Sequence, residues 1–290
     1  MNYLKFWGTR GSCSVSGKEM LKHGGNTCSL EISYQSTRVI IDAGTGIRPL
    51  GLELLEKGDR KIHLFIGHSH WDHLIGFPFF APIFQAGKQI HIWFPEGMPR
   101  PGRDLFKELF SIEFFPVHLE QIEAELHFHT SHPKTPINIE SLKIDFHQTN
   151  HPGTTHCFKI ITPKQKIGYV TDNEMLQGYH GPIGEVPDEV FEPHLDLVDF
   201  LSDCDIIVHE AQYTAKEYTE KVGWGHSSIP NALTLIQKTR CKHWIVTHHD
   251  PTHTDAELKS LLKETEKLIA EHQIPCKVEF AFDGMELLLA

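Results

Sequence analysis

Short apolar runs, rich in β-branched and aromatic residues, recur along the whole chain and alternate with polar turns. Runs of this length and composition are typical of β-strands. Ten of them stand out: TCSLEIS, TRVIID, KIHLFIG, QIHIWF, SLKIDFH, HCFKIIT, KIGYVTD, DIIVHE, KHWIVTH and KVEFAF. This number of strands predicts large sheets.

Between these runs, apolar residues recur every three to four positions, which indicates amphipathic helices. We expect helices over 47–57, 229–239 and 254–270. The spacing of Thr254 and Glu257 predicts a capping box at the start of the last helix. Helices interspersed with strands predict an α/β layered fold.

The pattern continues without a low-complexity stretch, a linker or a short-period repeat, so we expect one domain over 1–290. The segments at about 95–140 and 178–194 resemble loops inserted into that domain. The first segment is rich in phenylalanine: Phe106, Phe110, Phe114 and Phe115. We expect it to form a lid or a dimer contact, with simple core packing of these rings as the alternative.

Charge and composition narrow the class of protein. The chain has 38 acidic and 27 basic side chains, a formal charge of -11, which disfavours stable nucleic-acid binding. Six cysteines form no C-x-x-C pair, so we expect reduced thiols, mostly in the core. The start, MNYLKFWGTRGS, lacks the apolar stretch of a signal peptide, and no later run is long enough to span a membrane. These observations predict a cytoplasmic protein without a membrane partner.

The stretch FIGHSHWDHLIGF concentrates four candidate metal ligands, His68, His70, Asp72 and His73. It follows the predicted strand KIHLFIG, and residues two apart in an extended chain project to the same side. His68 and His70 can therefore bind one ion, and a turn would bring Asp72 and His73 toward a second. The alternative is a solvent-exposed loop that is rich in histidine and binds no metal.

This H-x-H-x-D-H run, preceded by IIDAGTG, resembles the metallo-β-lactamase superfamily, which implies an αββα sandwich with metals at one edge of two mixed sheets. Further motifs follow in the family's order: TNHPG, YVTDNE and IVTHHDP. The resemblance implies seven ligands, with His68, His70 and His151 on one ion, Asp72, His73 and His248 on the other, and Asp172 between them. His249 is the alternative to His248, and Asp42 would brace the ligand loop.

The resemblance implies two divalent ions, and we expect zinc, with manganese as the alternative. Two ions about 3.5 to 4 Å apart can share a hydroxide that attacks a phosphoryl centre. The motifs HEAQY and GWGHSS resemble elements of tRNase Z, in which a Glu and a His form a pair beside the metals. Glu210 would orient His226, and His226 would act as a general acid or charge clamp. With Asp72, these residues complete the expected catalytic set.

The stretches FWGTRGS, HGGNTCSLEI and GWGHSS resemble most closely the phosphodiesterases that include the phage anti-Pycsar enzymes and their bacterial relatives. The resemblance implies hydrolysis of 3′,5′-cyclic nucleotides to nucleoside monophosphates, and a homodimer whose partner chain helps to cap the pocket. Trp224 could stack on a base, although a core role is more usual for tryptophan.

Three other functions stay open at this point. A tRNA 3′ processing endonuclease and a phosphoribosyl cyclic phosphodiesterase keep the same chemistry with another substrate. A non-catalytic protein that binds a nucleotide is the third, but the full ligand set disfavours it.

Overall fold

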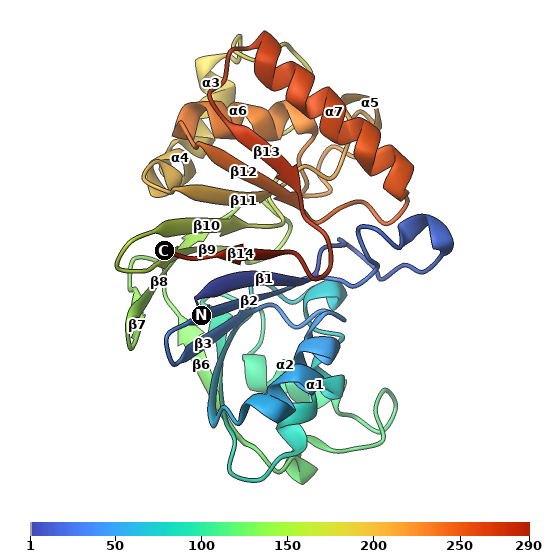
Figure 1. Cartoon of the computed structure of the whole chain (residues 1–290), viewed down its shortest axis with the longest axis vertical. Helices are drawn as coiled ribbons and strands as arrows, with labels where there is room; N and C mark the ends of the chain where they lie inside the picture. Colours follow the sequence, from blue (N-terminus) through green and yellow to red (C-terminus); the bar gives the residue numbers. More distant parts are fainter. Residues whose placement is uncertain (1) are drawn as a thin grey trace.

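The computed structural model describes residues 2–290 and consists of two seven-stranded mixed β-sheets packed face to face. Figure 1 shows helices α1 and α2 outside one sheet and helices α3 to α7 outside the other, which makes four layers. This architecture confirms the predicted αββα sandwich. Both ends of the chain lie beside each other at the same side of the sandwich.

The strands of the first sheet are, in spatial order, β14 (Glu286–Leu288), β1 (Tyr3–Gly8), β2 (Ser29–Tyr34), β3 (Thr37–Ile41), β4 (Lys61–Phe65), β5 (Gln89–Pro95) and β6 (Glu125–Ser131). Those of the second are β13 (Lys277–Phe280), β12 (His243–Thr247), β11 (Ile206–Glu210), β10 (Lys166–Val170), β9 (His156–Ile161), β8 (Leu142–Gln148) and β7 (Ile137–Ile139). All ten predicted strands are present.

The longer helices follow the predicted periodicity. The α-helices are α1 (Ile47–Lys57), α2 (Gly102–Leu109), α3 (Asp188–Phe191), α4 (Leu195–Leu201), α5 (Ala215–Tyr218), α6 (Ile229–Thr239) and α7 (Asp255–Glu271). Thr254 caps α7 and forms the predicted capping box with Glu257. Among the described residues, none of the helices combines the length and apolar character that crossing a membrane requires.

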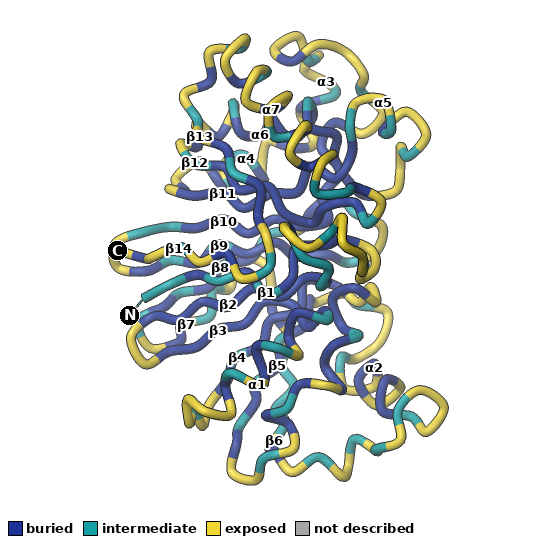
Figure 2. Tube along the Cα trace, turned by 45° about the vertical axis from the view of Figure 1, so that its right-hand side comes forward, coloured by how far each residue is buried: buried dark blue, intermediate teal, exposed yellow. Residues whose placement is uncertain are grey.

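Burial follows the alternation of side chains along each strand. In β4, Ile62 and Leu64 pack toward α1 and α2, whereas Phe65 packs between the two sheets with Phe158 and Ile245. Figure 2 shows inner strands of both sheets, such as β2, β3 and β11, as continuously buried stretches. The six cysteines are free thiols, and four of them are buried.

The segment at 95–140 is only partly the inserted loop that the sequence suggested. Its second half contains β6 and β7, which belong to the two sheets. Phe106 and Phe110 are buried against the first sheet, so the alternative of core packing holds for these two rings. Phe114 is 60% exposed, and Phe115 packs against Phe110. A lid or dimer contact therefore stays a prediction for Phe114 and its neighbours alone.

Candidate metal centre

The predicted ligands lie where parallel strands of both sheets end. Strand β3 runs parallel to β4, and β10, β11 and β12 run parallel to one another. Asp42 follows β3, His68 follows β4, Asp172 follows β10, and His248 follows β12. Carboxyl ends of parallel strands meet at one edge of a sheet. Side chains more than two hundred positions apart are gathered there for this reason.

Three of these residues have a left-handed backbone conformation. The φ angles are 64° at Asp42, 57° at Asp172 and 57° at His248. Positive φ is uncommon outside glycine and costs about 1 to 3 kcal/mol per residue. Such residues persist where the surrounding structure holds them, and they cluster at functional sites.

His68, His70 and His151 form the first group of candidate ligands. Their ring nitrogens lie within 4.8 Å of one another, and His70 Nδ1 is 3.1 Å from His151 Nε2. Burial lowers the pKa of His68 and of His151, which favours the neutral imidazole that binds a metal. This group contains all three histidines that the resemblance assigns to the first ion.

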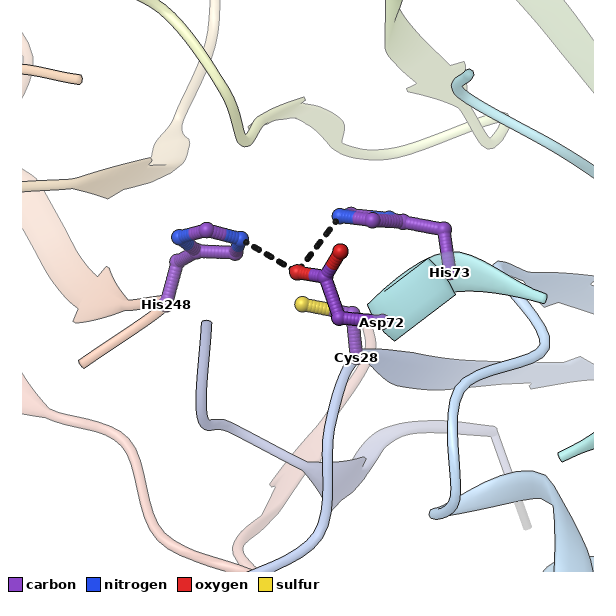
Figure 3. A group of neighbouring side chains, drawn as sticks. All are labelled: Cys28, Asp72, His73 and His248. Carbon is purple, nitrogen blue, oxygen red and sulfur yellow. Dashed lines mark hydrogen bonds and ion pairs between the residues drawn. The ribbon is translucent and has the colours of Figure 1, made fainter. Parts of the chain in front are cut away.

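Asp72, His73 and His248 form the second group, together with a residue that the sequence analysis did not single out. Asp72 Oδ2 lies 3.3 Å from His73 Nε2 and 3.2 Å from His248 Nε2 (Figure 3). The Cys28 sulfur lies beneath them, within 4.8 Å of their ligand atoms. Cys28 is fully buried, as a core cysteine would be, and although it lies in the HGGNTCSLEI stretch, the sequence analysis assigned it no role at the metal centre.

Asp172 lies between the two groups. One of its oxygens is 3.1 Å from His73 Nε2, and the other is 3.3 Å from His248 Nε2 and 3.8 Å from His68 Nε2. Burial alone would raise the pKa of this carboxyl group, but the surrounding histidines hold it well below the usual range. Asp172 is thus an ionised carboxylate within reach of both groups, as expected for a bridging ligand.

Nearby carboxylates raise the pKa values of the two histidines in the second group, His73 and His248. Burial would lower the pKa of His73 and of His248, but Asp172 and Asp72 raise both pKa values well above the usual range. The negative charge in this region is therefore large enough to hold cations. Divalent metal ions would meet the same demand and displace the protons.

The donor set fits two divalent metal ions. Both ring nitrogens of His68 are buried without a hydrogen-bond partner among the described residues. A buried polar atom left unpaired costs about 1 to 3 kcal/mol, so a ligand to these nitrogens would stabilise the site. Imidazole and carboxylate donors suit zinc and manganese.

Further contacts orient the ligands. Asp42 Oδ2 is 2.9 Å from His73 Nδ1, and the Gly67 backbone N–H donates to Asp42 Oδ1 at 2.8 Å. The Ser12 backbone N–H donates to Asp72 Oδ2 at 2.8 Å. Asp42 thus has the bracing contacts that the resemblance implies.

The contacts of His248 and His249 show which of the two can be a metal ligand. His248 Nε2 faces Asp72, whereas His249 Nε2 is 2.9 Å from the Ala281 carbonyl oxygen. The His249 ring stacks on Phe280, with 5.4 Å between centroids. Of the two alternatives, only His248 lies in the cluster.

Glu210 and His226 lie together at the edge of the cluster. Glu210 is the last residue of β11, and its Oε1 is 3.2 Å from His226 Nδ1. Burial opposes ionisation of Glu210, but its contacts, chiefly with His226, lower its pKa. His226 Nδ1 is 4.0 Å from Asp172 Oδ1. The carboxylate therefore orients an imidazole that adjoins the candidate bridging ligand.

Glu174 holds the loop that carries His226, and the sequence analysis missed it. It accepts hydrogen bonds from the Gly223 and Gly225 backbone N–H groups at 2.8 and 3.0 Å. The Gly225 carbonyl oxygen in turn lies 2.9 Å from His151 Nδ1. This contact turns His151 Nε2 toward the other ligands. Glu174 is the last residue of the YVTDNE motif, but its partners are about fifty positions away, so local spacing did not indicate its role.

Replacing Gly225 with alanine is expected to weaken metal binding about 10- to 100-fold, the cost typical of disturbing a ligand's supporting contacts. A Cβ atom at Gly225 would lie 2.2 Å from His151 Nδ1. Gly223→Ala is the matched control, because Gly223 also has positive φ and bonds to Glu174, but its Cβ would meet nothing closer than 3.6 Å. Zinc titration of both variants measures the difference. Equal affinities would contradict the expected role of Gly225.

Two exposed tryptophans lie next to residues of the candidate site along the chain. Trp71 follows His70 directly and is 56% exposed, and Trp224 precedes Gly225 and is 61% exposed. The core role, given as the more usual one for a tryptophan, is therefore wrong for Trp224. Large aromatic side chains left in water beside a cluster of candidate ligands are available to contact a substrate.

Comparison with known proteins gives consistent results. The family model for the Beta-lactamase superfamily domain matches residues 37–249. Ribonuclease Z from Pyrococcus furiosus is 25% identical over 288 residues, which cover 89% of this chain and 91% of that protein. The metallo-β-lactamase fold protein YhfI from Bacillus subtilis has a TM-score of 0.69 at 15% identity, with 99% and 98% of the two chains covered. A diphosphatase from the PhnP family has a TM-score of 0.64 at 19% identity, with 100% and 98% covered.

Proposed function

The chain belongs to the β-lactamase superfamily and is related to metal-dependent hydrolases, and on that premise we propose that it hydrolyses 3′,5′-cyclic nucleotides to nucleoside monophosphates. The observation that carries phosphodiester hydrolysis is the pair of Glu210 and His226, 3.2 Å apart beside Asp172, and the choice of a small cyclic nucleotide rests on the segment between β5 and β6 and on the net charge. A phosphodiester needs an acid for its leaving oxygen, and this pair supplies one.

The residues that would hold the ions are His68, His70 and His151 in one group, Asp72, His73 and His248 in the other, and Asp172 between them. Bound ions would supply Lewis-acid polarisation of the phosphate and a nucleophile at neutral pH. Zinc with manganese as the alternative stays the expectation, since imidazoles and carboxylates suit both.

His226 would protonate or stabilise the 3′ oxygen as it leaves phosphorus. With Nδ1 held by Glu210, the other ring nitrogen is left to face substrate. Ionised Glu210 stabilises the positive charge on the imidazolium, and its remaining contacts are backbone N–H groups of residues 173, 212 and 227. Breakage of the bond to the 3′ oxygen yields a nucleoside 5′-monophosphate.

A small substrate suits the segment between β5 and β6. Helix α2 in this segment is held on the first sheet through Phe106, with Phe110 beside it in the same core, so this part of the chain lies against the body of the protein. With a net charge of -11, these features favour a small nucleotide over a tRNA. The homodimer and the cytoplasmic location expected from the sequence stay predictions.

Cleavage at the 3′ end of precursor tRNA is the second candidate, and the full-length similarity to ribonuclease Z is the observation that favours it. The same metal ligands and the same Glu210 and His226 pair could serve both reactions. Only the groups that bind the rest of the substrate would differ.

A turnover panel with purified protein loaded with zinc or manganese tests the proposal. The panel contains the five common 3′,5′-cyclic nucleotides, a 2′,3′-cyclic nucleotide and a precursor tRNA. We expect at least one 3′,5′-cyclic nucleotide to be the best substrate by kcat/KM. Activity on the precursor tRNA alone would overturn the proposal in favour of the second candidate. Binding without product would indicate a non-catalytic nucleotide-binding protein.

A further inference from the structure

A small pocket lies beside the short segment that carries the candidate ligand His70. Ser69 and Trp71, the two neighbours of His70, form one wall, and Phe114 and α2 form the other. The volume of the pocket is about 110 Å³. That volume is below the range of roughly 300 to 1,000 Å³ of pockets for drug-sized ligands, so it matches part of a small molecule.

The walls of the pocket are aromatic at the mouth and aliphatic at the bottom. The rings of Trp71 and Phe114 meet edge to face, with 6.3 Å between centroids, and both are more than half exposed. Leu105 and Leu109 of α2 are buried beneath them. The exposed parts of these two rings offer π faces to a flat ligand.

The rim of the pocket carries one hydrogen-bond donor group and one acceptor group. Arg100 and Glu108 form an ion pair there, and both side chains are about half exposed. Their guanidinium and carboxylate can pair with the carbonyl and amino groups on the edge of a heteroaromatic ring. Aromatic walls and a polar rim together match a nucleobase, whose faces are apolar and whose edge is polar.

We infer that this pocket binds the nucleobase of the substrate and that Phe114 is a specificity-determining residue. The inference rests on the proposed function, because it assigns the base of the same molecule whose phosphate lies at the metal centre. His70 is a candidate metal ligand, and its two neighbours in the chain, Ser69 and Trp71, line the pocket. The pocket and the metal centre therefore share one short segment of the chain. The base would thus lie against the exposed faces of Trp71 and Phe114, above Leu105 and Leu109.

Phe114→Ala tests the inference in the metal-loaded full chain, because Phe114 is far in sequence from every candidate ligand. Two substrates are compared: uridine 3′,5′-cyclic phosphate and a 3′,5′-cyclic ribose phosphate with hydrogen in place of the base. Loss of one stacked ring is expected to raise KM for the nucleotide about tenfold and to lower the preference for it over the base-free substrate by a similar factor. Phe114→Tyr, which keeps the ring, should restore the preference.

Ile112→Ala is the matched control, since Ile112 is an exposed apolar residue of the same segment that does not line the pocket. Its substrate preference should equal that of the wild type.

An unchanged preference in Phe114→Ala, while the wild type still cleaves cyclic nucleotides, would overturn this inference alone. If Phe114→Ala instead dissociated a dimer and lost the same fraction of kcat/KM on both substrates, the inference would also be overturned. That result would indicate that the pocket contacts a second copy of the chain. A wild type inactive on every cyclic nucleotide would overturn the proposed function and this inference with it.

Discussion

Replacing Asp172 with asparagine is expected to lower kcat/KM by about 10³-fold or more and to reduce the metal content below two ions per chain. Asp172 is the carboxylate within reach of both ligand groups, at 3.1 Å from His73 and 3.8 Å from His68. Loss of a supporting contact to a metal ligand costs about 10- to 100-fold, so loss of a shared ligand should cost more. Metal analysis after desalting and steady-state kinetics measure the two effects.

Asp250→Asn is the matched control for this substitution. Asp250 is also buried and follows β12, but its carboxylate bonds to Thr252 and Lys221. Its variant should keep two ions and nearly full activity. If Asp172→Asn retained two ions and wild-type turnover, the assignment of Asp172 as the bridging ligand would be wrong.

Replacing His226 with alanine is expected to lower kcat about 10²- to 10⁴-fold, the range typical of a general acid, while two ions stay bound. The distances alone permit another role, because His226 also lies near Asp172 and His151, with ligand atoms within 4.8 Å. Metal content therefore decides between an acid and a ligand. A substrate with a better leaving group, such as a p-nitrophenyl phosphodiester, should lose less activity, because its departure needs less protonation.

His243→Ala provides the control for removing a histidine. His243 lies at the start of β12, paired with Glu279 away from the cluster, so its variant should keep its turnover. Loss of an ion from His226→Ala would contradict the proposed acid and indicate a metal ligand instead. If His226→Ala lost the same fraction of kcat on the cyclic nucleotide and on the p-nitrophenyl phosphodiester, that result would also contradict the role of His226 as a general acid.

The strands that the sequence predicted are those with dense β-branched runs, and the missed ones lack that signal for physical reasons. Strand β6 reads ELHFHTS, and its His129 stacks on Trp93 of β5, so polar rings occupy the face that apolar residues usually mark. Strands β7 and β14 have three residues each, too few for a periodic pattern. Strand β1 is the exception, because its residues do alternate, with Leu4 and Phe6 buried, and the sequence analysis nevertheless did not list it.

The candidate site also contains residues that the sequence analysis named and residues that it missed. The ligands of the H-x-H-x-D-H run were predictable from their local spacing, whereas His151, Asp172 and His248 were assigned through the family resemblance, from the order in which their motifs follow that run. Cys28 and Glu174 were missed although they lie in the quoted stretches HGGNTCSLEI and YVTDNE, because a buried thiol and a carboxylate bonded to a distant loop have no local signal of their own. The pocket of Trp71 and Phe114 was not predictable either, since it exists only once α2 has packed on the first sheet.

The most direct test of the central claim is phosphorus NMR of a 3′,5′-cyclic nucleotide incubated with the metal-loaded protein in ¹⁸O-enriched water. Attack of solvent oxygen on phosphorus with departure of the 3′ oxygen predicts a nucleoside 5′-monophosphate with one ¹⁸O on its phosphorus. The Asp172→Asn variant should leave the cyclic nucleotide intact under the same conditions. An unchanged cyclic nucleotide with the wild-type protein, alongside cleavage of precursor tRNA by the same sample, would contradict the claim.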